Sequence, residues 1–181
     1  MRTPIIDIAV EAGNWPPEDE LRRIAEGAVE AAAAVLAGVE PDVPAPREAT
    51  RDSAISILFT DDAGMQALNA RWRGKDRPTN VLSFPQAPGP WISALSGLSQ
   101  GEGEPVPLGD IVLAAETIRR EAALAEKPLE DHIPHLIIHG LLHLLGYDHE
   151  AEDEAEEMEQ LERAALSRIG IADPTAAARE K

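Results

Sequence analysis

Residues 139–149 read His-Gly-Leu-Leu-His-Leu-Leu-Gly-Tyr-Asp-His and hold three of the five histidines of the chain. His139 and His143 are four residues apart, so on a helix both imidazoles lie on one face, about 6 Å apart along the axis. Gly146 follows and tolerates left-handed dihedrals, so it can end the helix and turn the chain back. His149 then reaches the position of a third ligand. Three protein ligands leave a fourth position for water, which is typical of a catalytic metal site.

The same spacing occurs in H-E-x-x-H-x-x-G-x-x-H, the zinc helix of the metzincin proteases. Gly140 stands where such a protease needs a glutamate as general base. Met158 lies in an acidic helical pattern, so no methionine turn follows the histidines. The spacing therefore leaves a metallopeptidase as one alternative. The other alternative is a core helix in which two histidines occur by chance and bind no metal.

The composition of the 181-residue chain indicates one domain with a hydrophobic core. The chain contains no cysteine, which excludes disulfides and thiolate metal ligands and agrees with a reducing cytoplasm. The N-terminus lacks the basic segment and the apolar run of a signal peptide. No run of about 18 apolar residues occurs, so we expect a cytoplasmic protein without a membrane span.

A cluster of bases interrupts an otherwise acidic chain, whose net charge of −17 disfavours nucleic-acid binding. Residues 71–77 carry four bases and one acid. Arg71, Arg73, Lys75 and Arg77 are therefore candidate phosphate-binding residues, because an arginine fork pairs two phosphate oxygens at once. The alternative is an ordinary helix end, where bases favour the negative pole of the helix dipole.

The hydrophobic periodicity predicts an α+β fold, with one small mixed sheet packed with helices and without strict βαβ repetition. Strands are expected over residues 4–10, 53–60 and 108–114, and helices over 16–36, 62–72, 116–125, 128–145 and 150–169. Pro134 implies that the fourth of these helices begins near Ile133 or kinks. Proline and glycine predict a mobile loop over 86–107, and we expect the tail 173–181 to fray.

The last predicted helix carries eight acids between residues 150 and 162, and we expect them to form a solvated face. The residues expected on its apolar face are Met158, Leu161, Ala165 and Ile169. In the preceding helix, His135 is expected to be a partly exposed residue and not a fourth ligand, and His132 has no ligand spacing.

Two stretches resemble the signatures of the YbeY family, bacterial metal-dependent endoribonucleases of ribosomal RNA maturation. One is H-G-x-L-H-L-x-G-Y-D-H, from His139 to His149. The other is R-G-K-D-R-P-T-N-V-L-S-F-P, over residues 73–85. The Gly-Asp-Ile sequence at 109–111 also matches the family.

The resemblance covers about residues 53–165 and implies a single zincin-like domain, with a strand at 80–84 beside the site. It implies that the three histidines named above hold zinc and that Arg73 is the functional arginine facing the metal. Asp110 and Asp148 are candidates for supporting the site or for accepting a proton.

The function that the resemblance implies is zinc-dependent cleavage of single-stranded RNA. The expected substrate is the 3′ end of 16S ribosomal RNA, the expected role includes ribosome quality control, and the expected partners are the small ribosomal subunit and its proteins, not DNA. The metal would activate a water, and Arg73 would steady the charge that develops on phosphate. The alternatives are a metallopeptidase and a non-catalytic ribosome assembly factor, in which a structural metal stabilises the fold and the acidic chain contacts ribosomal proteins.

Overall fold

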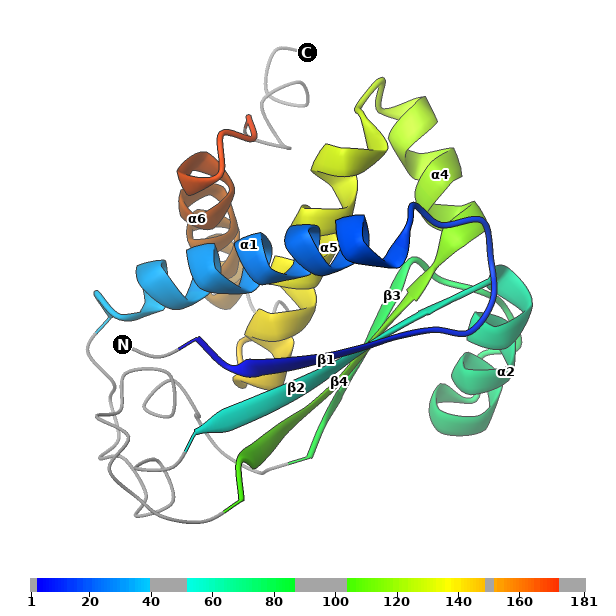
Figure 1. Cartoon of the computed structure of the whole chain (residues 1–181), viewed down its shortest axis with the longest axis horizontal. Helices are drawn as coiled ribbons and strands as arrows, with labels where there is room; N and C mark the ends of the chain where they lie inside the picture. The colour runs from blue at the N-terminus through cyan, green and yellow to red at the C-terminus, as the bar shows by residue number, and fades with distance from the viewer. Residues whose placement is uncertain (1–2, 40–51, 87–103, 149–151, 173–181) are drawn as a thin grey trace.

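A computed structural model of the chain describes residues 3–39, 52–86, 104–148 and 152–172. Its strands are β1 (Ile5–Val10), β2 (Ser53–Thr60), β3 (Val81–Pro85) and β4 (Val106–Ala114). Its helices are α1 (Glu18–Leu36), α2 (Asp62–Arg73), α4 (Ala115–Leu124), α5 (Leu129–Leu144) and α6 (Glu152–Arg168). The elements therefore follow the predicted order along the chain (Figure 1).

The boundaries differ from the predicted ones mainly around the long loop. β4 begins at Val106, two residues earlier than expected, so the end of the predicted loop 86–107 belongs to the sheet. Residues 87–103 and the tail 173–181 lie outside the described residues, and the predictions of mobility and fraying made for them stay predictions. Among the described helices, none is both long enough and apolar enough to cross a membrane.

The four strands form one sheet in the order β1-β2-β4-β3 (Figure 1). β1 and β4 both run parallel to β2, whereas β3 runs antiparallel to β4. The central strands β2 and β4 are rich in buried branched side chains such as Ile55, Ile57, Ile111 and Leu113, which suit a pleated surface. One mixed sheet with packed helices confirms the predicted α+β fold.

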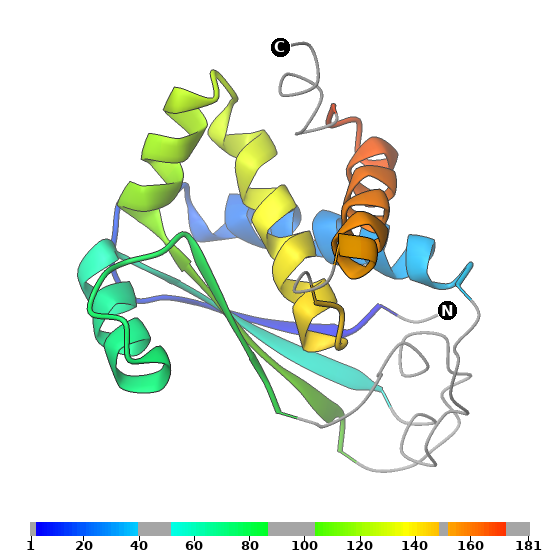
Figure 2. The same ribbon diagram turned by 180° about the vertical axis from the view of Figure 1, so that it is seen from behind.

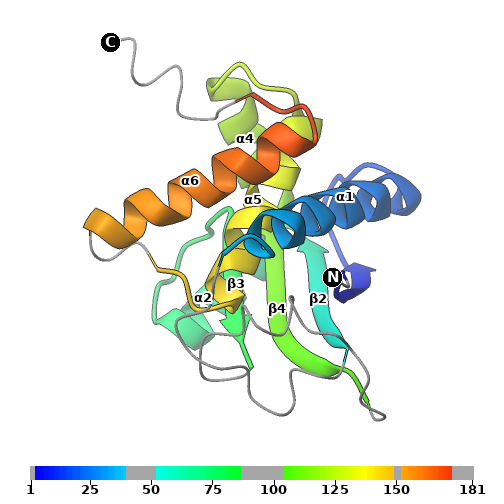
Figure 3. The ribbon, with the colours of Figure 1, turned by 90° about the vertical axis from the view of Figure 1, so that its left-hand side faces the viewer.

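The helices α1, α5 and α6 lie together on one face of this sheet, which we call the covered face (Figures 2 and 3). Ala25, Ala28 and Ala32 of α1 are buried, and such small side chains let neighbouring helices approach closely. α2 packs on the opposite face, where Met65 clusters with Val112 of β4. We call this second face the open face, because α2 is the helix that packs there among the described residues.

Helix α5 begins at Leu129, one residue after the predicted start at 128, so of the two alternatives for Pro134 the start near Ile133 is wrong and the kink stays a prediction. Glu130 and Asp131 occupy the first turn, where acids face the positive end of the helix dipole. Pro134 removes one backbone donor inside the helix. The helix nevertheless buries a row of large apolar side chains against the sheet, and this burial offsets the lost hydrogen bond.

Gly140 lies at a close contact between α5 and the sheet. Its carbonyl oxygen accepts a hydrogen bond from Ser83 Oγ of β3 at 3.2 Å. A Cβ added to Gly140 would stand 2.9 Å from Cγ2 of Ile111 and 3.2 Å from Ser83 Oγ. The missing side chain therefore lets α5 pack directly on β3 and β4, which fixes where the other faces of the helix point.

Candidate functional site

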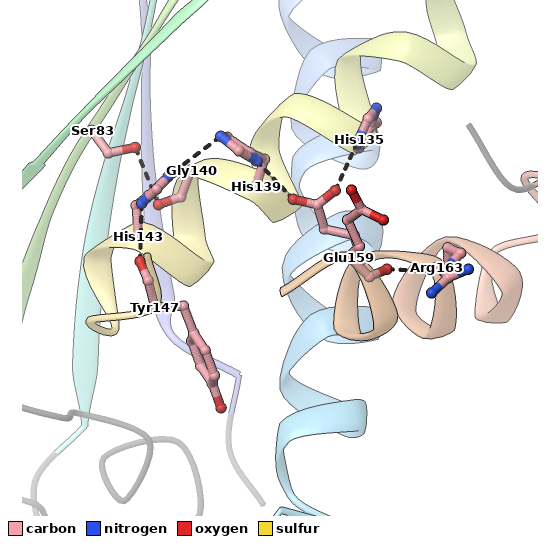
Figure 4. Close-up of polar contacts among 9 residues, drawn as sticks. Ser83, His135, His139, Gly140, His143, Tyr147, Glu159 and Arg163 are labelled. Carbon is pink, nitrogen blue, oxygen red and sulfur yellow. Dashed lines mark hydrogen bonds and ion pairs between the residues drawn. The ribbon is translucent and has the colours of Figure 1, made fainter. Parts of the chain in front are cut away.

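His139 and His143 lie one above the other on a single face of α5, as their spacing predicts (Figure 4). Their Nε2 atoms are 3.1 Å apart. The two ring centroids are 4.6 Å apart, and the ring planes are nearly perpendicular, at 80°. The two imidazoles therefore aim the same nitrogen at one point beside the helix.

The other nitrogen of each ring contacts an oxygen (Figure 4). Nδ1 of His139 lies 2.7 Å from Oε1 of Glu162, and Nδ1 of His143 lies 3.0 Å from the backbone oxygen of Tyr147. A carboxylate and a carbonyl oxygen only accept hydrogen bonds, so Nδ1 of both rings carries the hydrogen and donates it. In the neutral rings, the Nε2 lone pairs of His139 and His143 then face each other.

This donor set fits a zinc ion. Two ligands at 2.0–2.1 Å in a tetrahedral site stand about 3.3 Å apart, close to the observed separation of the two Nε2 atoms. A cation between them also offsets the repulsion of two converging lone pairs. Within the described ranges, no group of three His, Asp or Glu side chains is arranged to hold an ion. The predicted third ligand, His149, lies outside the described residues.

Glu162 of α6 corrects the expectation that the acids of residues 150–162 form a solvated face, because its side chain is buried, with 8% of its surface exposed. Its second oxygen, Oε2, lies 3.0 Å from Nε2 of His135. Burial is the largest single influence and raises the pKa of Glu162, but hydrogen bonds and charge interactions with His135 and His139 together lower this pKa to about 2. The carboxylate is therefore ionised at neutral pH.

Sequence reasoning missed Glu162, although the helical period contains a signal for it. Glu162 is four residues after Met158 and three before Ala165, and both of these apolar residues are buried. It therefore occupies a position on the apolar face of α6. An acid at such a position needs a partner inside the fold.

A cleft of about 830 Å³ opens beside the paired histidines. His139, His143 and Asp148 line one wall, and Val81 and Ser83 of β3 contribute to the lining. The candidate phosphate-binding residues that also line this cleft are Arg73, Lys75 and Arg77. The structure thus brings together two predicted ligands, three predicted bases and Asp148.

The bases are placed by the end of α2. Gly74 has a left-handed φ of 66° and ends the helix, so the chain turns back toward β3. Nη2 of Arg73 donates a hydrogen bond to the backbone oxygen of Ser83 at 3.0 Å. Asn69 donates from Nδ2 to the backbone oxygen of Arg77 at 2.7 Å, which holds the loop that follows.

Two predicted residues do not join this site. The Arg71 guanidinium lies over the ring of Trp72, 5.1 Å from its centroid, and does not line the cleft. Asp110 accepts a hydrogen bond from Gln86 at 2.9 Å and lines a groove of about 510 Å³ on the open face. Since Ile111 points toward Gly140 on the covered face, the adjacent Asp110 points the other way, and its expected supporting role is not met.

A smaller pocket of about 350 Å³ is also lined by His139. His132 and His135 line this pocket, and Nε2 of His132 lies 3.1 Å from Oε2 of Glu121. Burial, the largest influence, lowers the pKa of His132, whereas the neighbouring Glu121 raises it. Both of these histidines thus have carboxylate partners.

Known proteins resemble this chain over almost its whole length. The family model described as Endoribonuclease YbeY matches residues 17–170. A relative from Sinorhizobium medicae, named Endoribonuclease YbeY, is 52% identical over 169 residues, which cover 93% of each chain. A relative of the same name from Chelativorans is 52% identical over 171 residues, which cover 94% of this chain and 93% of that one.

A solved structure supports the fold. The solution structure of a Thermotoga maritima protein aligns with a TM-score of 0.52 and 21% sequence identity, and covers 92% of both chains. The family model and the relatives at about half identity extend well beyond the two motifs. The chain therefore belongs to the YbeY endoribonuclease family and is an enzyme that hydrolyses RNA.

Proposed function

We propose that this protein is a zinc-dependent endoribonuclease that cleaves single-stranded RNA, with His139, His143 and His149 as the metal ligands. The observation that carries the proposal is the convergence of two Nε2 atoms at 3.1 Å, while both Nδ1 atoms donate to oxygens. Neutral imidazoles held in this tautomer are preorganised metal ligands. The same cleft also carries three bases, which match a phosphate backbone.

A zinc ion bound at this point would lower the pKa of its water and polarise a phosphoryl oxygen. Arg73 is anchored by the Ser83 carbonyl and lines the cleft, where its guanidinium would steady the negative charge that develops on phosphate. Lys75 and Arg77 attract the neighbouring phosphates of the strand, so binding should weaken as salt rises. Asp148 lies in the same lining and is a candidate proton acceptor.

The cellular role that we propose is maturation of the 3′ end of 16S ribosomal RNA and ribosome quality control, in the cytoplasm and on the small ribosomal subunit with its proteins. The support is the match to a family whose members are named endoribonucleases. The chain has a net charge of −17, so its acidic surface would repel RNA everywhere except at the basic cleft. The same acidic surface would attract basic ribosomal proteins.

The test combines zinc analysis of purified protein with cleavage of single-stranded RNA. His139→Ala and His149→Ala should each lose zinc to a similar extent and lose cleavage. His132→Ala, a histidine of the same helix outside the cleft, is the matched control and should retain both. Full zinc occupancy in the His149 variant contradicts the three-ligand site, and a zinc-loaded parent protein that leaves RNA intact contradicts the function.

A metallopeptidase stays the second candidate because of the histidine spacing alone. The structure supplies an argument against it, since position 140 is a glycine packed on the sheet, where an added Cβ would stand 2.9 Å from Cγ2 of Ile111 and 3.2 Å from Ser83 Oγ. Casein and single-stranded RNA, offered side by side to the zinc-loaded protein, separate the two activities. Cleavage of casein but not of RNA would favour the peptidase.

The non-catalytic assembly factor is distinguished by chelation. One hydrophobic cluster joins α1, the sheet, α5 and α6, so we expect the chelated protein to stay folded and to lose cleavage. Unfolding followed by circular dichroism, with and without chelator, measures this. A domain that melts on chelation would indicate a structural metal.

A further inference from the structure

Among the described residues, Glu162 is the only ionisable side chain that is buried. A buried carboxylate is costly unless its oxygens are paired and hydrogen-bonded. Both of its oxygens contact α5: Oε1 lies 2.7 Å from Nδ1 of His139, and Oε2 lies 3.0 Å from Nε2 of His135. The two histidines are about one helical turn apart, so the carboxylate spans about one turn of α5.

We propose that Glu162 is a positioning residue of the metal centre, which fixes the tautomer and the ring orientation of His139. By accepting the Nδ1 hydrogen, the carboxylate leaves the Nε2 lone pair of His139 directed at the point where Nε2 of His143 also converges. Its negative charge also makes the imidazole a stronger donor to a cation. This inference rests on the proposed function only for the identity of the site as a metal centre.

His135 completes the arrangement. Nε2 of His135 contacts Oε2 of Glu162, whereas Nδ1 of His139 contacts Oε1. Contacts to both oxygens fix the orientation of the carboxylate. Met158, Ala165 and Leu166 on the same helix are buried in the core and anchor α6 beside α1 and α5. The orientation of His139 therefore depends on tertiary packing as well as on α5 itself.

The two ligands differ in how they are oriented. His143 donates to the carbonyl oxygen of Tyr147, four residues further along the chain, so the turn that follows α5 supplies its acceptor. His139 takes its acceptor from α6, 23 residues further along the chain. The metal centre thus extends beyond the motif at 139–149 and includes a helix that the motif does not cover.

The alternative is an ion pair that only docks α6 on α5. Such a pair would affect the melting temperature but not the tautomer of His139 or the affinity for zinc. Glu162→Ala removes the acceptor, and Glu162→Gln keeps the shape while removing the charge. Glu159→Gln is the matched control, since Glu159 is exposed on the same helix and lines the same 350 Å³ pocket.

Two measurements on the full chain decide between these readings. Long-range proton–nitrogen NMR of the metal-free protein reports which nitrogen of His139 carries hydrogen. Competition with a chelating dye gives the affinity for zinc. We expect the parent protein and Glu159→Gln to hold the hydrogen on Nδ1 and to bind zinc equally. Glu162→Ala should lose that preference and bind zinc about 10- to 100-fold more weakly, with a smaller loss in Glu162→Gln.

An unchanged tautomer and zinc affinity within twofold of the parent in Glu162→Gln, with only a lower melting temperature, would overturn the inference. The isosteric Glu162→Gln carries this decision even where Glu162→Ala does not fold. The outcome is separable from the proposed function. A parent protein that binds zinc with the expected tautomer but does not cleave RNA contradicts the function and leaves the role of Glu162 intact.

Discussion

Polar side chains on the two sides of the sheet have different surroundings. On the side of the covered face, Glu162 of α6 is buried and contacts two histidines of α5. On the open face, Asp110 is partly exposed, bonds to the nearby Gln86, and shares a groove with Trp72, whose side chain is 59% exposed. The carboxylate of Glu162 is therefore buried and paired through both oxygens, whereas Asp110 pairs with an exposed side chain.

This difference indicates where side chains can be held in a fixed orientation. A ligand that must hold its orientation within a few tenths of an ångström needs neighbours that cannot relax. His139 and His143 have such neighbours because Gly140, which lies between them in α5, is packed against β3 and β4. Substitutions on the covered face should therefore have large effects, and those on the open face small ones.

The largest expected effect follows from Gly140→Val. The added Cβ would stand 2.9 Å from Cγ2 of buried Ile111, so α5 or β4 must move, and we expect a loss of about 3 kcal/mol of stability. Urea unfolding measures this loss. Gly27→Val is the control, since an added Cβ there meets nothing within 4 Å, and its cost should stay below about 0.5 kcal/mol. Equal losses in the two variants would remove the argument for close packing at Gly140.

Arg73→Ala should reduce RNA cleavage roughly a hundredfold, the scale for losing one preorganised donor. Zinc content should stay unchanged, and stability should change by no more than about 0.5 kcal/mol, because the side chain is exposed. Arg73→Lys should restore cleavage only partly, since an ammonium lacks the bidentate fork. Single-turnover cleavage at saturating RNA is the measurement.

Arg71→Ala is the matched comparison for Arg73, since it removes the same charge from the same helix end on the side away from the cleft. We expect a loss of only a few-fold, through weaker general attraction of RNA. If Arg73→Ala cleaves RNA like the parent, Arg73 is an ordinary helix-end base and its catalytic assignment is wrong.

A smaller effect is expected from Lys75 and Arg77. Removing both with alanine should reduce the slope of log affinity against log salt by about 2, one for each lost phosphate contact. The cleavage rate at saturating RNA should change little. RNA binding at several salt concentrations tests this, and an unchanged slope would show that the strand does not follow these two bases.

The smallest effect is expected from Asp110→Asn on the open face. The asparagine keeps a hydrogen-bond acceptor for Gln86, so stability should stay within about 0.5 kcal/mol of the parent. Zinc content and cleavage should not change, because the side chain points away from Gly140 and the histidines. A loss of zinc in this variant would contradict the separation of the two faces.

The histidine pair could be predicted because four residues on a helix define one face, a local property that the rest of the fold does not alter. The basic loop could be predicted from charge, and its approach to β3 agrees with the strand expected beside the site. The side of the sheet to which Asp110 points could not be predicted, because it depends on how β4 packs against α5. The contact between Glu162 and the histidines could not be predicted, because it depends on how α6 packs against α5. Eight acids lie between residues 150 and 162, and the sequence does not distinguish the buried one from the exposed ones.

At Pro134 a local rule left two alternatives, a helix that starts near Ile133 or a kinked helix, and the structure excludes the first. Pro134 disfavours a helix by its own chemistry, but the long apolar face of α5 stabilises the turn that precedes it. Sequence patterns thus located the elements and most of the cleft. They did not determine which side chains from separate elements meet.

The packing at Gly140 also limits how this scaffold can change its chemistry. The zinc-helix motif of the metzincin proteases has a glutamate where this chain has Gly140. Within this motif, the two enzyme classes therefore differ by one substitution. In this fold, the Cβ of a glutamate at that position would stand 2.9 Å from Cγ2 of Ile111 and 3.2 Å from Ser83 Oγ. Introducing the glutamate would therefore require α5 or β4 to shift as well, so the packing of the sheet restricts which side chains this position can carry.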